Sequence, residues 1–188
     1  MTSSPRENLY YVVKMKDLFP NPLDDLLNFL KNRRDQTGIV YCHQRVDCVS
    51  LAKELACMGF SAAAYHAGLA NSVREKVQTH WMEGKIKIIT ATVSFGMGVD
   101  KRDVRFVVHW SMPSSLEAYY QESGRAGRDG QRSECLLYYS TSDSSLKTFL
   151  MKQVRYLYAG SRNILVFYNI LKKYLCALEP FFRNILVF

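Results

Sequence analysis

Two arginines stand three positions apart within the run Tyr119–Gly130, which reads YYQESGRAGRDG. Only small residues separate Arg125 from Arg128, so little bulk obstructs either side chain. A guanidinium group offers a planar set of donors that matches phosphate oxygens, and it keeps its charge near neutral pH. Two of them on a glycine-rich turn suit a polyanion whose charge grows during reaction, as in phosphoryl transfer. The alternative is a solvated charged loop, and Gln121 at a fixed spacing favours the phosphate site.

A second run with polar and glycine residues, Thr90–Asp100, follows a predicted strand. The hydroxyls of Thr90 and Thr92, together with backbone N–H groups near Gly98, are of the kind that bind phosphates. Asp100 is suited to accept hydrogen bonds from ribose hydroxyls or from an arginine. Taken alone, the run is equally typical of an ordinary turn between a strand and a helix.

A third short run, Tyr65–Leu69, also follows a predicted strand. Gly68 permits close approach of the backbone to a ligand, and His66 is able to donate to a phosphate. A single histidine more often has a structural hydrogen-bonding role. That interpretation is the one we adopt for three other histidines, His43, His80 and His109.

Two motifs that normally accompany phosphate chemistry are absent from the sequence. It contains no G-x-x-x-x-G-K-[ST] loop to surround phosphates, and no Asp-Glu-x-His or Asp-Glu-Ala-Asp run to hold Mg²⁺. The sequence thus has arginines suited to stabilise a transition state but lacks a loop that binds the nucleotide's phosphates. This combination indicates one half of a composite active site.

The elements that position these runs alternate between strand and helix. Short apolar runs predict strands at 38–42, 62–65, 87–91, 104–110 and 134–139. Helices are predicted from Pro22 with Asn21 as N-cap, over 46–58 closed by Gly59, from a Ser72/Glu75 capping box, from a Ser114/Glu117 cap, and from Ser142. This alternation predicts an α/β fold with a parallel sheet covered on both faces. Ligands in such folds bind at the carboxyl ends of the strands, where we expect all three runs.

Composition narrows the class of protein further. The 188 residues carry a formal net charge of +8, which favours a polyanionic partner such as nucleic acid. The five cysteines are odd in number and lack C-x-x-C spacing, so we predict neither disulfides nor a zinc site. Cys42 and Cys135 lie in apolar runs and are expected to be buried. No secretory signal or membrane-spanning run is apparent.

Four segments together closely resemble the second RecA-like domain of RecQ-family DNA helicases, in superfamily 2. They are GIVYCHQR (38–45), YHAGL (65–69), TATVSFGMGVDKRDVRFVVHW (90–110) and YYQESGRAGRDG (119–130). DEAD-box RNA helicases share the Gly-Arg-x-Gly-Arg core but usually have His-Arg where Gln121 and Glu122 stand here. The resemblance implies a RecA-like fold over residues 9–152, with 1–8 as a linker. Residues 153–188 form a hydrophobic tail, helical or irregular, that contains a repeated RNILVF and resembles nothing in the family.

In that family, two RecA-like domains hold ATP between them while single-stranded DNA crosses both. The resemblance implies that Arg128 is the arginine finger on the γ-phosphate and that Gln121 bridges the cleft. Arg125 would contact phosphate or the acidic motif of the first domain. Asp100 and Gly98 then belong to the nucleotide site. It also implies that the DNA backbone is contacted by His66, Gly68, Thr90 and Thr92. Arg45 fits the same role and equally fits a surface charge at the start of a helix.

The function implied is part of an ATP-dependent RecQ helicase that unwinds DNA 3'-to-5' in DNA repair and recombination. ATP and Mg²⁺ would be used only together with a first RecA-like domain, which the chain is expected to lack. The family implies a nuclear location, or a cytoplasmic one if the protein is bacterial. Two alternatives remain open: a non-catalytic module that binds nucleic acid or protein, and a domain of another superfamily 2 helicase.

Overall fold

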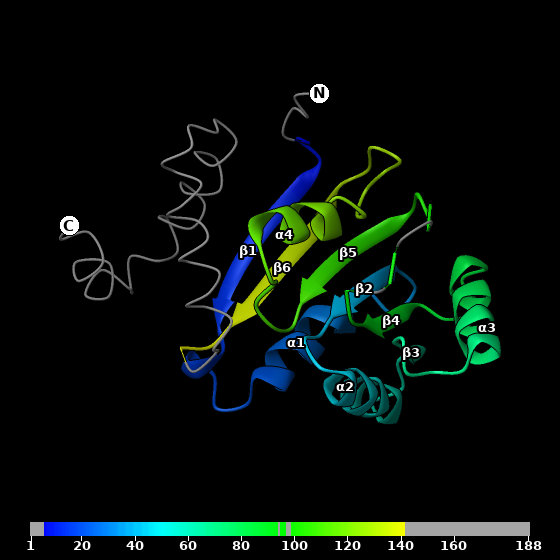
Figure 1. Cartoon of the computed structure of the whole chain (residues 1–188). Coiled ribbons are helices and arrows are strands. Elements are labelled where there is room, and N and C mark those ends of the chain that lie inside the picture. Colours follow the sequence, from blue (N-terminus) through cyan, green and yellow to red (C-terminus); the bar gives the residue numbers. More distant parts are fainter. Residues whose placement is uncertain (1–5, 94, 97–98, 142–188) are drawn as a thin grey trace. The chain divides into compact units, whose positions relative to one another are not determined.

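The computed structural model describes residues 6–93, 95–96 and 99–141. These residues form a six-stranded parallel sheet with the strand order β1-β6-β5-β2-β4-β3 (Figure 1). The strands are β1 Leu9–Met15, β2 Thr37–Tyr41, β3 Ala62–Tyr65, β4 Ile88–Ala91, β5 Val104–His109 and β6 Ser133–Tyr139. The helices are α1 Pro22–Lys31, α2 Arg45–Cys57, α3 Asn71–Met82 and α4 Leu116–Ser123, with a 3-10 turn at Lys16–Leu18. The predicted α/β parallel sheet is confirmed.

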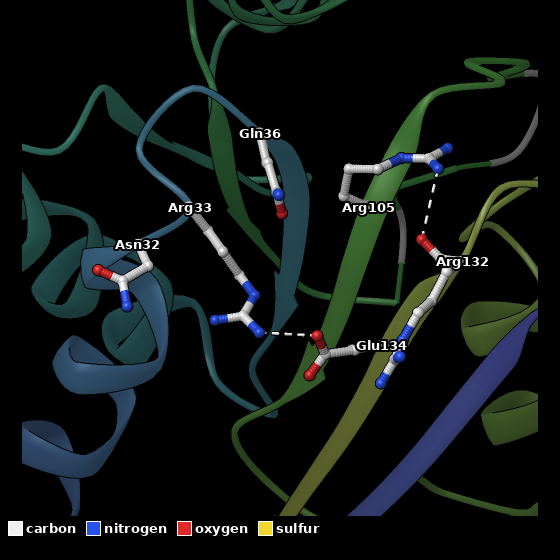
Figure 2. Close-up of a pocket in the computed structure, with 6 residues that line it drawn as sticks. All are labelled: Asn32, Arg33, Gln36, Arg105, Arg132 and Glu134. Atoms are coloured by element: carbon white, nitrogen blue, oxygen red, sulfur yellow. Dashed lines mark hydrogen bonds and ion pairs between the residues drawn. The ribbon is translucent and has the colours of Figure 1, made fainter.

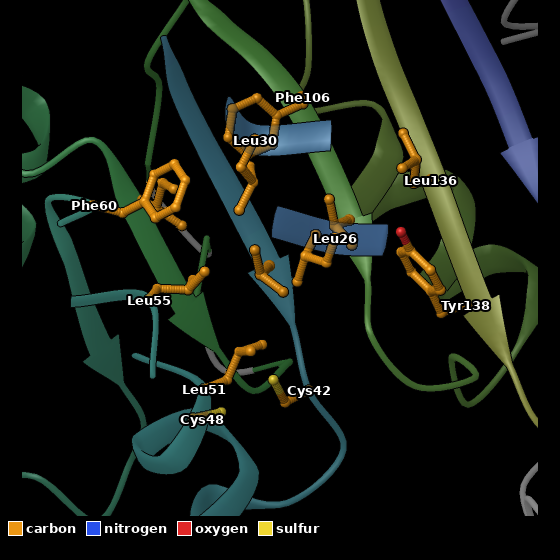
Figure 3. Close-up of a cluster of buried hydrophobic side chains, with 13 residues drawn as sticks. Leu26, Leu30, Cys42, Cys48, Leu51, Leu55, Phe60, Phe106, Leu136 and Tyr138 are labelled. Atoms are coloured by element: carbon orange, nitrogen blue, oxygen red, sulfur yellow. The ribbon is translucent and has the colours of Figure 1, made fainter. Parts of the chain in front are cut away.

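Helices α1 and α2 cover one face of the sheet. Leu26 and Leu30 of α1 and Leu51 and Leu55 of α2 pack in a single cluster with inward-facing strand residues such as Phe106 (Figure 3). All of these side chains are almost completely buried. This burial explains the apolar stripe of α1, whose leucines recur at helical spacing.

The opposite face is covered by α3 and by the segments that carry the candidate site. Trp81 of α3 is fully buried there, together with Phe95, Val99 and Ala126. Trp81 and Phe95 make an edge-to-face contact, with ring centroids 5.3 Å apart. Part of the Thr90–Asp100 run therefore belongs to the core on this face. So does part of the loop that follows α4 and carries Arg125 and Arg128, which we call the arginine loop.

Strand β1 was not predicted from the sequence. It pairs in parallel with β6, from Leu9 opposite Ser133 to Met15 opposite Tyr139. Its sequence, LYYVVKM, is rich in tyrosine and valine and follows Ser, Pro and Asn residues, so a strand signal was present there and was not used. Pairing with a strand more than 100 residues away decides its conformation.

Helix boundaries agree with the sequence where the capping residue is unambiguous. The Oδ1 of Asn21 accepts a hydrogen bond from the Leu23 N–H at 3.2 Å, and Gly59 follows α2 with φ of +78°. The predicted Ser72/Glu75 box is wrong, because α3 begins at Asn71 and its N-cap, Ala70, makes no side-chain bond.

Helix α4 is capped one residue later than predicted. Ser115, not Ser114, has the extended backbone of an N-cap, and its hydroxyl accepts from the Ala118 N–H at 3.2 Å. Either serine hydroxyl is able to cap a helix, and only the path of the chain after β5 decides which of the two does so. Ser142 and the boundary at 152 lie outside the described residues, as does the tail. None of the helices described is long and apolar enough to cross a membrane.

Candidate nucleotide and nucleic-acid site

The arginine loop lies beside the start of β5, not at the carboxyl ends of the strands as predicted. The Gly127 N–H donates to the Val104 carbonyl at 2.8 Å, and the Asp129 N–H donates to the Arg102 carbonyl at 3.2 Å. The reason is the length of α4, whose eight residues run back along the sheet by about 12 Å before the loop begins (Figure 1).

Arg128 and Asp100, which the sequence assigned to one site, are brought together. The Nη1 of Arg128 lies 2.8 Å from Oδ1 of Asp100 and 3.3 Å from the Val99 carbonyl oxygen. The Asp100 side chain is 75% exposed and that of Arg128 is 32% exposed. The pair therefore holds one guanidinium group in a defined place while leaving part of it accessible. Gly98 lies outside the described residues.

Arg125 is held more deeply than Arg128. Its Nη1 donates to the Gly96 carbonyl at 2.5 Å, while its buried Nε has no hydrogen-bond partner among the described residues. Burial raises the pKa of the Tyr41 hydroxyl above its ordinary value, and the charge of Arg125 opposes that rise.

Gly96 makes this position of Arg125 possible, and the sequence analysis did not single it out. Its φ is +115°, and a Cβ atom at Gly96 would overlap the guanidinium carbon of Arg125. The sequence showed only that the Thr90–Asp100 run contains two glycines, and nothing in it indicated that Gly96 is the one that packs against Arg125.

The segment predicted to be a linker supports the arginine loop from the other side. The Nδ2 of Asn8 donates to the Gly127 carbonyl at 2.8 Å and to the Gln131 carbonyl at 2.9 Å. Arg6 donates to the carbonyl of Ala126. These three contacts bridge about 120 residues of sequence, so no local pattern predicts them.

Gln121 and Glu122, neighbours on the last turn of α4, have opposite environments. The Gln121 side chain is exposed, as a residue that reaches across a cleft must be. Glu122 is buried, with Oε2 lying 2.8 Å from Nε2 of His109. The structural role predicted for His109 is confirmed, since its side chain is 1% exposed and stacks against Tyr41.

A second group of predicted residues meets at the carboxyl edge of the sheet. Arg45 begins α2 and His66 directly follows β3. Both lie next to Gly68, where a Cβ atom would be 3.1 Å from Nη1 of Arg45 and 3.2 Å from Nδ1 of His66. His66 is 7% exposed, and neither ring nitrogen has a hydrogen-bond partner in the part of the chain described. A cation beside an unsatisfied imidazole suits an anionic ligand.

The two threonines assigned to the DNA side differ. Thr90 is fully buried, and its hydroxyl donates to the Cys48 carbonyl at 2.7 Å, so its predicted contact with DNA is wrong for this conformation. Its place in β4, which lies between β2 and the edge strand β3, explains this burial. Thr92 lies just beyond the end of β4 and is partly exposed.

The cysteines and acidic residues offer no metal site within the described ranges: no three His, Cys, Asp or Glu side chains are grouped to hold a metal ion. Cys42 and Cys135 are buried as predicted. Burial raises the pKa of the Cys135 thiol to about 12, which leaves it unreactive.

Comparisons with known proteins agree with these motifs. The family described as "Helicase conserved C-terminal domain" matches residues 21–130. The chain is 49% identical over 157 residues to ATP-dependent DNA helicase Q5 of Rattus norvegicus, covering 79% of this chain and 16% of that protein. It is 40% identical to ATP-dependent DNA helicase Q-like 2 of Arabidopsis thaliana, covering 98% of this chain and 26% of that protein. The latter alignment extends into residues 153–188.

Solved structures share the fold. A DEAD box protein from Methanococcus jannaschii is 30% identical with a TM-score of 0.63, covering 73% of this chain and 37% of that one. The DEAD-box protein SrmB of E. coli, solved with a regulator of ribonuclease activity, has a TM-score of 0.64 at 22% identity, covering 77% of this chain and 83% of that one. The chain spans about a sixth of the rat relative's length and a quarter of the Arabidopsis one's. The chain belongs to the helicase C-terminal domain family and is a second RecA-like domain of the RecQ type.

Proposed function

We propose that this domain is one half of an ATP-driven DNA-unwinding enzyme. In this proposal Arg128 and Arg125 contact the phosphates of ATP held on another RecA-like domain, and Gln121 reaches toward that domain. The observation that carries the proposal is the Arg128–Asp100 pair at 2.8 Å, which holds a partly exposed guanidinium group in place.

The residues present fit the phosphates of ATP but not Mg²⁺. Arg125 has a buried Nε without a partner among the described residues, and Arg128 has a single carboxylate contact. Bound ATP supplies the phosphoanhydride bond whose hydrolysis drives movement. Arg128 would neutralise the charge that develops on the phosphate oxygens, and Asp100 would hold its guanidinium in place before the contact forms. We assign no step to Mg²⁺, since no acidic cluster within the described residues is arranged to hold it.

The DNA backbone would cross the carboxyl edge of the sheet. Arg45 and the imidazole of His66 would bind phosphate oxygens, Gly68 would allow the backbone to approach, and Thr92 would border the path. The net charge of +8 supports a polyanionic partner. We assign 3'-to-5' unwinding, roles in DNA repair and recombination, and a nuclear location on the RecQ resemblance; the rat and Arabidopsis relatives lend no support to a bacterial cytoplasm.

A fusion of this full chain behind the first RecA-like domain of a RecQ relative tests the nucleotide role. DNA-stimulated ATP hydrolysis should appear in the fusion and fall by ~10³–10⁵-fold on Arg128→Ala. Arg132→Ala is the matched control, because the Arg132 guanidinium lies 4.1 Å above the Tyr10 ring, away from the Arg128–Asp100 pair. Robust hydrolysis by the lone chain, or full activity of the Arg128→Ala fusion, would contradict the proposal.

A non-catalytic nucleic-acid module is the second candidate, favoured by the Arg45–His66 pair in a chain without a phosphate loop. Single-stranded DNA binding by the lone chain should weaken linearly with the logarithm of salt concentration. Arg45→Ala should lower the affinity and the salt slope together, whereas Arg34→Ala, whose guanidinium donates to the carbonyl of Gly59, should change neither. Binding that ignores salt would exclude phosphate contacts.

A further inference from the structure

Arg105 of β5 joins the two segments that carry the Arg128–Asp100 pair. Its Nη2 lies 2.6 Å from Oδ1 and 2.7 Å from Oδ2 of Asp129. Its Nε donates to the Asp103 carbonyl at 3.2 Å, and its Nη1 to the Arg132 carbonyl at 3.4 Å (Figure 2). One side chain therefore spans from the segment after Asp100 to the segment after Arg128.

Backbone hydrogen bonds run alongside this side chain. The Asp129 N–H donates to the Arg102 carbonyl at 3.2 Å, and the Gln131 N–H donates to Oδ1 of Asp129 at 3.0 Å. Asp129 directly follows Arg128 in the chain, so the position of the Asp129 carboxylate limits where the Arg128 backbone can lie. The guanidinium of Arg105 is the group that restrains that carboxylate through two bonds.

We propose that Arg105 and Asp129 are positioning residues, which hold Arg128 at the place where it meets phosphate. This inference rests on the proposed function of Arg128. The side chains of Arg105 and Asp129 are only 18% and 28% exposed, so solvent shields their contact less than it shields a fully exposed ion pair. Nη2 of Arg105 contacts both Asp129 oxygens while Nε and Nη1 donate to the Asp103 and Arg132 carbonyls, a set of three separate donors that the single nitrogen of a lysine does not reproduce.

The cavity beside Arg105 supplies matched controls. It has a volume of about 320 Å³ and is lined by Asn32, Arg33, Gln36, Arg105, Arg132 and Glu134 (Figure 2). Arg33 pairs with Glu134 at 2.7 Å, and the Arg132 guanidinium stacks on Tyr10. Arg33→Ala and Arg132→Ala thus remove a cation from the same cavity without touching the Asp129 carboxylate.

The test uses the same two-domain fusion and separates kcat from KM. Arg105→Ala should lower kcat for ATP by ~10–100-fold with little change in KM, because a displacement of about 1 Å costs on the order of 10²-fold. Arg105→Lys should not restore kcat. The Arg105→Ala/Arg128→Ala double variant should be no slower than Arg128→Ala alone, because both substitutions remove the same contact between Arg128 and phosphate. Asp129→Asn, which keeps the side-chain volume, should reproduce Arg105→Ala.

A readout on the lone chain separates this inference from the proposed function. The side-chain Nε–Hε NMR signal of Arg128 should shift or broaden in Arg105→Ala and Asp129→Asn, and stay in place in Arg33→Ala, with every variant still folded at neutral pH. If Arg128→Ala keeps full hydrolysis, the proposed function fails whatever the NMR shows. The positioning role is overturned if Arg128→Ala is slow while Arg105→Ala and Asp129→Asn hydrolyse ATP as fast as the unmodified fusion. It is also overturned if the loss of kcat in a double variant equals the product of the losses in the two single variants.

Discussion

The carboxylate of Glu122 lies 2.8 Å from Nε2 of His109, and both side chains are buried. This contact fastens the last turn of α4 to the end of β5. Because α4 leads directly into the arginine loop, the pair also fixes where that loop begins. The rings of Tyr41 and Tyr119 lie against the imidazole, with centroid distances of 5.4 and 4.8 Å, and help to exclude water.

Removing one member of this pair should destabilise the domain. Glu122→Ala leaves the buried imidazole without its partner, and we expect the free energy of unfolding to fall by roughly 1–3 kcal/mol in urea titrations. Gln121→Ala, at the exposed neighbouring position, should change it by less than about 0.5 kcal/mol. A replacement of both residues, His109→Phe with Glu122→Leu, should cost less than Glu122→Ala. A Glu122→Ala variant as stable as the unmodified chain would contradict this role.

Gly96→Ala should displace Arg125. The substitution combines a φ of +115° with an overlap between the new methyl group and the Arg125 guanidinium. Gly130→Ala is the matched control, since Gly130 also has a positive φ, +82°, but its Cβ atom would meet nothing within 4 Å. Strain alone should cost both variants about 1–3 kcal/mol of unfolding free energy. Only Gly96→Ala should move the Arg125 Nε–Hε NMR signal, and equal signals in both variants would refute the overlap.

Thr90→Val tests whether Thr90 contributes to the core or to a DNA site. The hydroxyl donates to the Cys48 carbonyl at 2.7 Å, so its loss should lower the unfolding free energy by about 1–2 kcal/mol. Affinity for single-stranded DNA, measured by fluorescence anisotropy, should not change. A stable Thr90→Val variant with weakened DNA binding would restore the role predicted from sequence.

The Arg105–Asp129 contact should weaken in acid. The hydrogen bond from Arg105 lowers the pKa of Asp129 below its ordinary value of 3.8. A lowered pKa in the folded state contributes stability that is present above the ordinary value and lost as pH falls through the folded one. The difference in unfolding free energy between the unmodified chain and Asp129→Asn should therefore be constant from pH 7 to pH 5 and shrink below about pH 4. A difference that stays constant to pH 2.5 would show that the charge of Asp129 does not act.

Local pattern was enough to predict most elements of this domain. Strands β2 to β6 and the start of α1 are marked by short apolar runs and by an Asn-Pro cap, and such signals act over a few residues. Contact with an arginine was one of the two roles expected for Asp100, the other being contact with ribose hydroxyls, and the structure pairs Asp100 with Arg128. Arg45, His66 and Gly68 meet at the carboxyl edge because parallel strands bring the residues that follow them to one side.

Long-range contacts decided the rest. Strand β1 exists because β6 pairs with it, Asn8 is ordered by the loop it binds, and Thr90 is buried because β4 lies between two other strands. The length of α4 carries the arginine loop back to the start of β5, where Arg105 meets Asp129. The sequence by itself determined which side chains are present for phosphate chemistry. Only the tertiary structure decided where the two arginines lie and what restrains them, because those restraints join segments that are distant in the chain.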